Sequence, residues 1–254
     1  MASEVEPRLS GATPLIRCVG LQKWYGAVQA LKNVDLDVGY GEIIGLVGDN
    51  GAGKSTLIKI LSGVHPQDEG TIEVEGRMVD ITGPRFAMQL GIETIYQYTA
   101  MVPEMSIAQN FFIGREPLLW GRRGFGIVDR TRMRQEALDG LRGIELHLRG
   151  PDVPVKSLSG GQRQGVAIAR AMHFRSKVLI LDEPTNHLSV KETHKVLDHV
   201  VELKHQGVTS VFISHNLHHV HPISDRIVIM ARGEKIADVA RGDTSVEEMT
   251  RLIS

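Results

Sequence analysis

The sequence predicts an α/β fold with a mainly parallel sheet, an antiparallel β part near the N-terminus and an inserted helical section. Three observations support this prediction. A glycine-rich turn joins an apolar run to a helical pattern within residues 43–61. Apolar runs alternate with helical patterns from residue 178 onward, which is typical of parallel sheets. Between these two regions, at about 98–172, helical signals dominate.

The composition is that of a globular protein whose charges nearly cancel. The 254 residues suffice for one α/β domain carrying an inserted subdomain, expected at 15–254. Residues 1–14 are polar and lack the apolar core of a signal peptide, so we expect a disordered leader. No apolar run approaches the roughly 20 residues that cross a bilayer. A soluble protein is therefore expected, or one that a partner holds at a membrane.

Charge and cysteine content narrow the function classes further. The formal net charge of −1 gives no electrostatic support for nucleic-acid binding by the chain as a whole. Cys18 is the single cysteine, so no internal disulfide can form. We expect its side chain to be a small buried apolar group rather than a reactive thiol.

The first half of the domain is expected to start with short strands. Residues 16–19 form the first, and the alternation of apolar residues at 30–38 predicts a half-buried antiparallel strand. A buried strand at 43–47 precedes a helix at 54–61, which Gly63 ends. The remaining elements expected here are a hairpin of 71–74 and 78–80, a helix at 85–89 and a strand at 92–95.

The helical section is expected to be an insertion within this one domain. Ser106 is predicted to cap a helix at 107–112, and Asp129 precedes a helix at 131–141. Residues 114–126, rich in Gly, Arg and Pro, are expected to form a loop. The later elements expected are strands at 178–181, 208–213, 226–231 and 235–239, a helix at 190–204 and a C-terminal helix capped by Ser245.

The turn after the strand at 43–47 fits the phosphate-binding pattern G-x-x-x-x-G-K-[ST]. Its glycines allow a tight turn, and successive N–H groups form an anion site at a helix N-terminus. Lys54 supplies a charge for the β- and γ-phosphates, and the Ser55 hydroxyl suits Mg²⁺. The alternative, a glycine-rich turn that binds nothing, is disfavoured by the strand and helix on either side. The predicted nucleotide contacts are Gly48, Asp49, Asn50, Gly51, Ala52, Gly53, Lys54, Ser55 and Thr56.

An acidic pair, Asp182 and Glu183, closes the apolar run at 178–181. Ligands of open α/β sheets bind outside the carboxyl ends of the strands, so this pair is expected to face the same crevice as the phosphate loop. Asp182 suits holding Mg²⁺ through its water shell, and Glu183 suits orienting or deprotonating a water. Without the loop, a solvated acidic strand end would be the better interpretation.

A second anion site is indicated by Leu158-Ser159-Gly160-Gly161-Gln162, ahead of a helix expected at 163–172. Ser159 is a good N-cap, and the two glycines expose backbone donors at the helix start. Alone, a serine-glycine cap is a weak signal. Together with the phosphate loop and the acidic strand, it makes the chain resemble the ATP-binding subunits of ATP-binding-cassette (ABC) transporters, whose signature it matches letter for letter.

The resemblance covers essentially the whole chain and implies a P-loop NTPase core with ATP and Mg²⁺ as cofactors. It also implies a head-to-tail dimer, in which the signature of one subunit completes the ATP site of the other. The signature residues implied to contact nucleotide are Ser159, Gly160, Gly161 and Gln162. Three departures stand out: residues 184–190 lack the family's common aspartate, Gly165 replaces a bulkier polar residue, and 98–100 lack an acidic residue.

Further roles follow from the resemblance alone. Tyr25 matches the aromatic residue that stacks on adenine, with ordinary packing as the alternative. Gln97 matches a glutamine that reaches Mg²⁺ and the attacking water, and His215 a histidine that contacts the γ-phosphate. The implied catalytic residues are Lys54, Gln97, Glu183 and His215, and the implied metal ligands are Ser55, Gln97 and Asp182.

The histidine-rich run 215–221 allows a metal site as a competing hypothesis. His215 and His219 have i, i+4 spacing, which suits two ligands on one helix face. No acidic or cysteine partner is near in sequence, however, and Asn216 is predicted to be a helix cap. The nucleotide interpretation is therefore preferred.

Segments 94–97, 106–110 and 113–116 resemble the simple-sugar importers. This resemblance implies an ATPase at the cytoplasmic face of the cell membrane, importing a small solute for which a monosaccharide is favoured. Its partners would be a second copy of the chain, two transmembrane permease subunits docked at the helical insertion and, indirectly, an extracytoplasmic solute-binding protein, with no nucleic acid. One alternative is a nucleoside importer. A second is a soluble ABC ATPase, a class that usually has paired cassettes or coiled-coil insertions. A third is a nucleotide-gated module that does not hydrolyse ATP, but Glu183 and His215 argue against it.

Overall fold

The computed structural model describes residues 13–96, 101–122, 125–144, 146 and 148–253, so most of the predicted leader at 1–14 lies outside the described residues. The chain forms two compact units. The first comprises Met1–Thr94, Lys177–Glu183 and Val200–Ser254, and the second Ile95–Ser176 and Pro184–His199. The expected helical subdomain lies within the second unit, and the assignment of both units to one domain stays a prediction. Among the described residues, no helix combines the length and apolar character that a membrane span requires.

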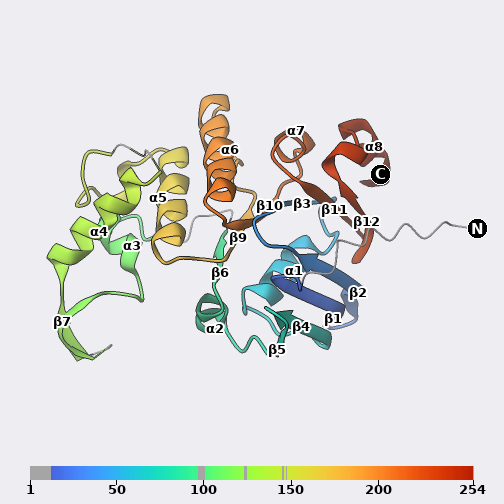
Figure 1. Cartoon of the computed structure of the whole chain (residues 1–254), viewed down its shortest axis with the longest axis horizontal. Coiled ribbons are helices and arrows are strands. Elements are labelled where there is room, and N and C mark those ends of the chain that lie inside the picture. The colour runs from blue at the N-terminus through green and yellow to red at the C-terminus, as the bar shows by residue number, and fades with distance from the viewer. Residues whose placement is uncertain (1–12, 97–100, 123–124, 145, 147, 254) are drawn as a thin grey trace, which may run out of the picture. The chain divides into compact units, whose positions relative to one another are not determined.

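The first unit contains the expected antiparallel sheet, in which the strand order is β2-β1-β4-β5 (Figure 1). Its strands are β1 (Ile16–Tyr25), β2 (Val28–Val38), β4 (Glu69–Val74) and β5 (Arg77–Val79). The first strand extends six residues beyond the predicted end at Val19, because Leu21 and Lys23 are also buried against the unit. The register of β1 against β2 shifts between Cys18 and Leu21, and this irregularity interrupts the simple alternation.

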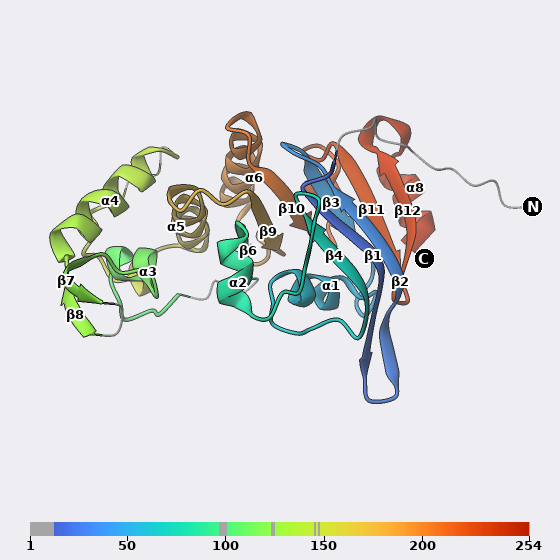
Figure 2. The same cartoon turned by 60° about the horizontal axis from the view of Figure 1, so that its bottom comes forward.

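The larger sheet has the strand order β12-β11-β3-β10-β9-β6, and its strands lie side by side in Figure 2. They are β3 (Ile43–Val47), β6 (Ile92–Ile95), β9 (Val178–Asp182), β10 (Thr209–Ile213), β11 (Arg226–Ala231) and β12 (Glu234–Ala240). Strands β11, β3, β10 and β9 pair in parallel, and β12 pairs antiparallel with β11. Buried continuous apolar runs form these parallel strands, so the prediction of a mainly parallel sheet is confirmed.

Helices of the first unit are α1 (Lys54–Leu61), α2 (Pro84–Gln89), α7 (Leu217–Val220) and α8 (Val246–Ile253), and α6 (Val190–His205) begins in the second unit and ends in the first. Gly63 follows α1 with φ 72°, the conformation that commonly ends helices. The predicted cap of α8 is confirmed, because the Ser245 hydroxyl accepts a hydrogen bond from the Glu248 N–H at 3.1 Å.

The second unit is built on α3 (Ile107–Phe112), α4 (Arg130–Arg142) and α5 (Gly160–His173), which pack against one another (Figure 1). Both predicted caps are confirmed: the Ser106 hydroxyl accepts from the Gln109 N–H at 3.2 Å, and the Asp129 carboxylate accepts from the Arg132 N–H at 2.9 Å. Aromatic rings of Phe111, Phe112, His173 and Phe174 contact each other between α3 and α5.

One prediction for this unit is wrong. Residues 114–126, expected to form a loop, contain most of an antiparallel hairpin of β7 (Leu118–Arg122) and β8 (Phe125–Val128). Three of its apolar side chains are exposed, with relative exposures of 68% for Leu119, 76% for Trp120 and 61% for Ile127. Because Leu119, Trp120 and Ile127 face solvent, these positions do not show the apolar–polar alternation that normally indicates a half-buried strand.

Candidate functional site

The phosphate loop follows β3 and ends at the first residue of α1. Gly48 has φ 147°, and a Cβ there would lie 2.1 Å from the carbonyl oxygen of Met230. Gly53 has φ 102°, and a Cβ there would lie 2.8 Å from the carbonyl oxygen of Ala30. Glycine is therefore required at both positions, because backbone from neighbouring strands fills the space that a side chain would need.

Lys54 lies at the N-terminal turn of α1 and is buried. Its ammonium group donates to the carbonyl oxygens of Gly48 at 2.5 Å and Asp49 at 2.9 Å, so the loop closes around the charge. Burial lowers the pKa of Lys54, and the nearby carboxylates of Glu183 and Asp182 oppose this shift. The loop thus presents a fixed positive charge at the start of a helix, where anions are favoured.

The acidic pair lies at the carboxyl end of β9. Ile213 of β10 pairs with Leu46 of β3 on one side and with Asp182 of β9 on the other, so Asp182 is level with the strand that enters the phosphate loop. Burial raises the pKa of Asp182, repulsion by Glu183 raises it further, and the positive charge of Lys54 partly opposes both. A nearby cation would relieve this cost.

Glu183 has an unusual backbone and a well-fixed side chain. Its φ of 50° lies in the left-handed region, which costs of the order of 1 kcal/mol for a residue with a Cβ. The carboxylate accepts from the Ser214 hydroxyl at 3.1 Å, from the His215 N–H at 3.0 Å and contacts His215 Nδ1 at 2.9 Å. These contacts hold the Glu183 carboxylate firmly at the carboxyl end of the parallel strands, as a residue that orients water requires.

The histidine-rich run is divided among separate contacts. His215 faces Glu183, His219 Nε2 lies 3.1 Å from the Asn216 amide nitrogen, and His221 Nε2 lies 3.0 Å from the carbonyl oxygen of Thr244. Asn216 caps α7 as predicted, because its side chain accepts from the His218 N–H at 3.0 Å. In the part of the chain that the structure describes, no three His, Cys, Asp or Glu side chains gather into a metal-binding group.

Tyr25 lies at the end of β1 in the first unit, with 42% of its surface exposed. One edge of its ring meets His65 at a centroid distance of 5.7 Å, and the Lys23 ammonium lies 5.8 Å from the ring centroid. A half-exposed aromatic ring can stack on a flat ligand. Other predicted loop residues have mixed exposure: Ala52 is buried, Thr56 is half-buried, and Asp49, Asn50 and Ser55 are exposed.

The signature pentapeptide begins α5 in the second unit, three residues before the predicted helix start. The Ser159 hydroxyl accepts from the Gln162 N–H at 3.3 Å, and the Gln162 side chain accepts from the Ser159 N–H at 2.9 Å. These reciprocal bonds form a capping box, which the spacing S-x-x-Q signals and our sequence reasoning missed. The helix therefore starts at Gly160, so both glycines lie in its first turn.

Gln97, a predicted site residue, and the following residues 98–100 lie outside the described residues. A Cβ on Gly165 in the signature helix would lie 2.7 Å from a terminal methyl group of Leu146, so a larger residue there would require the Leu146 side chain to shift. The first unit thus brings together the phosphate loop, Asp182, Glu183 and His215, and the second unit holds Ser159 to Gln162.

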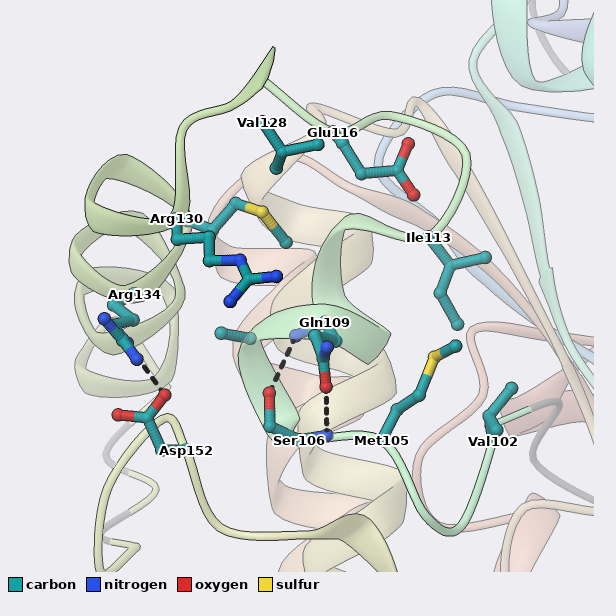
Figure 3. Close-up of a pocket in the computed structure, with 12 residues that line it drawn as sticks. Val102, Met105, Ser106, Gln109, Ile113, Glu116, Val128, Arg130, Arg134 and Asp152 are labelled. Atoms are coloured by element: carbon teal, nitrogen blue, oxygen red, sulfur yellow. Dashed lines mark hydrogen bonds and ion pairs between the residues drawn. The ribbon is translucent and has the colours of Figure 1, made fainter. Parts of the chain in front are cut away.

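The second unit also contains a cavity of about 550 Å³, shown in Figure 3. Val102, Met105 and Ile113 form an apolar side of it, with relative exposures of 40%, 40% and 42%. Arg134 and Asp152 form an ion pair at 2.7 Å on another side. This combination of apolar surface and charge suits a protein segment better than a phosphate group.

Comparisons with known proteins agree with this geometry. The model of the ABC transporter family matches residues 31–186, more than half of the chain. The chain belongs to this family and is an ATP-binding subunit of it, an ABC transporter ATPase. Its ATP-binding role and its fold are therefore those expected from the sequence.

Individual relatives cover the chain almost completely. The fructose import ATP-binding protein of Rhizobium meliloti is 43% identical, covering 95% of this chain and 94% of the relative. The xylose/arabinose import ATP-binding protein of Sulfolobus acidocaldarius is 40% identical, covering 94% of each. A ribose import ATP-binding protein of Rhodopirellula baltica is 41% identical over 92% of this chain, which spans only 45% of that relative.

Solved structures share the fold. A nucleotide-free ATP-binding cassette from an ABC transporter matches with a TM-score of 0.81 and 27% identity over 95% of both chains. A dimeric bacterial ABC transporter cassette matches with a TM-score of 0.74 and 25% identity, covering 89% of this chain and 98% of that one.

Proposed function

We propose that this chain hydrolyses MgATP to drive the import of a monosaccharide. It would act as a head-to-tail homodimer on two permease subunits at the cytoplasmic face of the cell membrane, with a solute-binding protein on the far side. Three of the relatives described above are import ATP-binding proteins for fructose, xylose/arabinose or ribose, which supports a sugar as cargo. None of them indicates which sugar this chain serves.

The observation that carries the proposal is the fixed carboxylate of Glu183 beside Asp182 at the end of β9. Their charges act on Lys54 of the phosphate loop, so these groups share one electrostatic environment. Glu183 polarises the attacking water, His215 and Lys54 stabilise the charge on the γ-phosphate, and Tyr25 stacks on adenine. Gln97, assigned from the sequence alone, completes the catalytic set.

The residues present fit a magnesium ion. Ser55 and Asp182 offer a hydroxyl and a carboxylate, the hard oxygen ligands that Mg²⁺ prefers, and burial leaves the Asp182 charge in need of a cation. These two residues would hold the ion together with Gln97. When bound, the ion neutralises developing phosphate charge.

Replacing the carboxylate tests the catalytic assignment. Glu183→Gln is expected to lower turnover by at least about 100-fold, the effect of losing a general base, while retaining ATP binding. It should also trap an ATP-bound dimer, measured by light scattering. Glu234→Gln, at an exposed carboxylate of β12, is the matched control and should hydrolyse ATP at the wild-type rate. Undiminished turnover in Glu183→Gln would remove the assigned role.

The signature supports the dimer. A capped helix start with two glycines offers backbone donors to an anion, and no ATP-binding role within its own subunit is assigned to it. In the proposed dimer, Ser159, Gly160, Gly161 and Gln162 close on the γ-phosphate held by the partner's phosphate loop. Crosslinking of the trapped Glu183→Gln protein tests this arrangement, and signature surfaces that point away from the partner's nucleotide would contradict it.

The cavity in the second unit is the proposed docking surface for the permease. An amphipathic cytoplasmic segment would place apolar side chains against Val102, Met105 and Ile113, with polar groups towards the Arg134–Asp152 pair. Family membership supports this occupant, because ABC transporter ATPases act on membrane subunits.

The cargo is tested in the purified membrane complex. A monosaccharide-loaded binding protein is expected to stimulate ATP hydrolysis. Stimulation by nucleosides and by no monosaccharide would replace the sugar proposal with the nucleoside alternative. A complex that binds ATP but never turns it over would favour a nucleotide-gated module.

A further inference from the structure

The segment that follows the acidic strand packs directly on the signature, within the second unit. A Cβ on Gly160 would lie 2.6 Å from a methyl carbon of Leu188, and one on Gly161 would lie 3.0 Å from Cβ of Glu192. Besides exposing their N–H groups, the signature glycines leave space for two side chains of the neighbouring segment. These side chains, Leu188 and Glu192, pack against the start of α5.

Glu192 is first of all a capping residue of its own helix. The Ser189 N–H donates to its carboxylate at 3.1 Å and the Ser189 hydroxyl donates at 2.9 Å, while the Glu192 N–H reaches the Ser189 hydroxyl at 3.4 Å. This arrangement is a capping box at the start of α6. It places a carboxylate two residues after the segment 184–190, which lacks the family's common aspartate.

The same carboxylate also reaches the signature. The Ser159 hydroxyl donates a hydrogen bond to it, and the Gly161 N–H lies 3.4 Å from Oε1, a long hydrogen bond. Together with the Ser189 bonds, the Ser159 bond lowers the pKa of Glu192 to about 2, so the group is an anion at neutral pH. The anion site of α5 is thus in contact with an anion of its own chain.

Two anions cannot use the same donors. The proposed function assigns Ser159 and Gly161 to the γ-phosphate of ATP held by the partner subunit, and without that phosphate Glu192 accepts from both. We infer that Glu192 is a positioning residue that competes with the γ-phosphate for the signature, so that closure of the dimer requires ATP to displace its carboxylate. This inference rests on the proposed dimer.

The exchange can occur without unfolding the helix start. When Glu192 releases Ser159 and Gly161, its bonds to Ser189 still hold the carboxylate at the N-terminus of α6, where a negative charge is favoured. ADP lacks the phosphate that replaces the carboxylate. The competition therefore also disfavours closure on the product.

The experiment uses the full chain in the Glu183→Gln background and measures the ATP concentration at half-maximal dimer formation by light scattering. Glu192→Gln removes the charge but keeps a side chain that can also form a capping box. Because hydrogen bonds to charged groups are stronger than neutral ones, we expect the required ATP concentration to fall about fivefold. Glu202→Gln, at an exposed position of the same helix, should leave it unchanged.

The outcomes separate the inference from the proposed function. An unchanged or raised ATP requirement in Glu192→Gln overturns the competition, even if the parent dimerises, because a purely structural carboxylate would not ease closure. A parent that never dimerises with ATP overturns the proposed dimer, and the inference falls with it. Dimer formation by Glu192→Gln with ADP, absent in the parent, would be additional support.

Discussion

Individual residues of the nucleotide site differ in how tightly their surroundings constrain them. Gly48 and Gly51 both have positive φ, but a Cβ on Gly48 would meet backbone at 2.1 Å, whereas one on Gly51 would meet nothing within 4 Å. Glu183 also has a positive φ, 50°, although it carries a Cβ. The site therefore combines positions where packing demands glycine with one where side-chain chemistry outweighs backbone strain.

This contrast gives a stability prediction. Gly48→Ala is expected to lower the free energy of unfolding by about 2–4 kcal/mol, because backbone must move to admit the methyl group. Gly51→Ala should cost only about 1–2 kcal/mol, the cost of the left-handed conformation. Urea unfolding of the nucleotide-free proteins measures both, and equal losses would contradict the packing argument.

Asp182 gives a prediction about pH. Its pKa is raised in the folded chain, so the carboxylate costs nothing when both states are protonated, and the cost develops as pH rises through the folded pKa. Asp182→Asn is therefore expected to raise the free energy of unfolding of the nucleotide-free protein at pH 7. The gain should shrink as the pH approaches 4. Denaturant unfolding checks this, with the exposed Asp198→Asn as control.

The variant Asp182→Asn is also expected to bind the metal ion more weakly. If Asp182 helps to hold the ion, MgATP should stabilise the wild type more than Asp182→Asn in thermal unfolding. A variant that MgATP stabilises fully would contradict its place among the metal ligands.

Much of this site was predictable at the residue scale, since the pattern at 48–55 and the acidic pair at 182–183 are local in sequence. What could not be predicted depends on contacts between distant residues. A methyl group of Leu146 lies over Gly165, and Glu192 meets Gly161 of the signature, 31 residues earlier in the chain. Gln97 stays an expectation from resemblance.

Among the helices, two in the second unit begin with the same device. Ser106 with Gln109 caps α3, and Ser159 with Gln162 caps α5, each with a serine hydroxyl and a glutamine side chain in reciprocal bonds. Only the second has glycines between them. Comparing the caps of α3 and α5 therefore distinguishes the contribution of a cap to stability from the role of the signature in catalysis.

Removing each cap tests this separation. Ser106→Ala and Ser159→Ala are both expected to lower the free energy of unfolding by about 1 kcal/mol. Only Ser159→Ala should also reduce ATP hydrolysis at saturating protein concentration. A similar loss of hydrolysis in Ser106→Ala would mean that helix stability, rather than signature chemistry, limits turnover.

The start of α6 adds an acid-dependent prediction. The pKa of Glu192 falls from 4.5 to about 2 on folding, so its stabilising contribution is complete above about pH 4.5 and is lost as the pH falls towards 2. The stability advantage of the wild type over Glu192→Gln should follow this course in urea unfolding at pH 6, 4 and 3. A difference that does not depend on pH would contradict it.

Elements were predictable wherever burial imposes a periodic pattern. The parallel strands and the capped helices agree with their predicted ranges to within about three residues at each end. The hairpin of β7 and β8 did not follow from its sequence, because Leu119, Trp120 and Ile127 are exposed and its glycines and arginines are typical of a loop.

For the molecule as a whole, the proposed docking cavity would connect the chain to its membrane partner. Met105→Glu places a charge on the apolar side of the cavity, and its 40% exposure predicts a stability change within about 0.5 kcal/mol. ATP binding by the isolated chain should be unaffected, but stimulation of hydrolysis by the permease should fall. Met88→Glu, at a residue of α2 with 42% exposure, is the control. Equal stimulation of ATP hydrolysis in both variants would contradict the proposal that the permease docks at this cavity.

The thiol of Cys18 lies fully inside the first unit, where burial raises its pKa to about 12. As the chain has no other cysteine, any cysteine engineered onto the surface would react alone with a maleimide dye or a spin label. Fluorescence or electron-spin measurements between two labelled copies can thus test opening and closing of the proposed dimer without a cysteine-free background having to be built first.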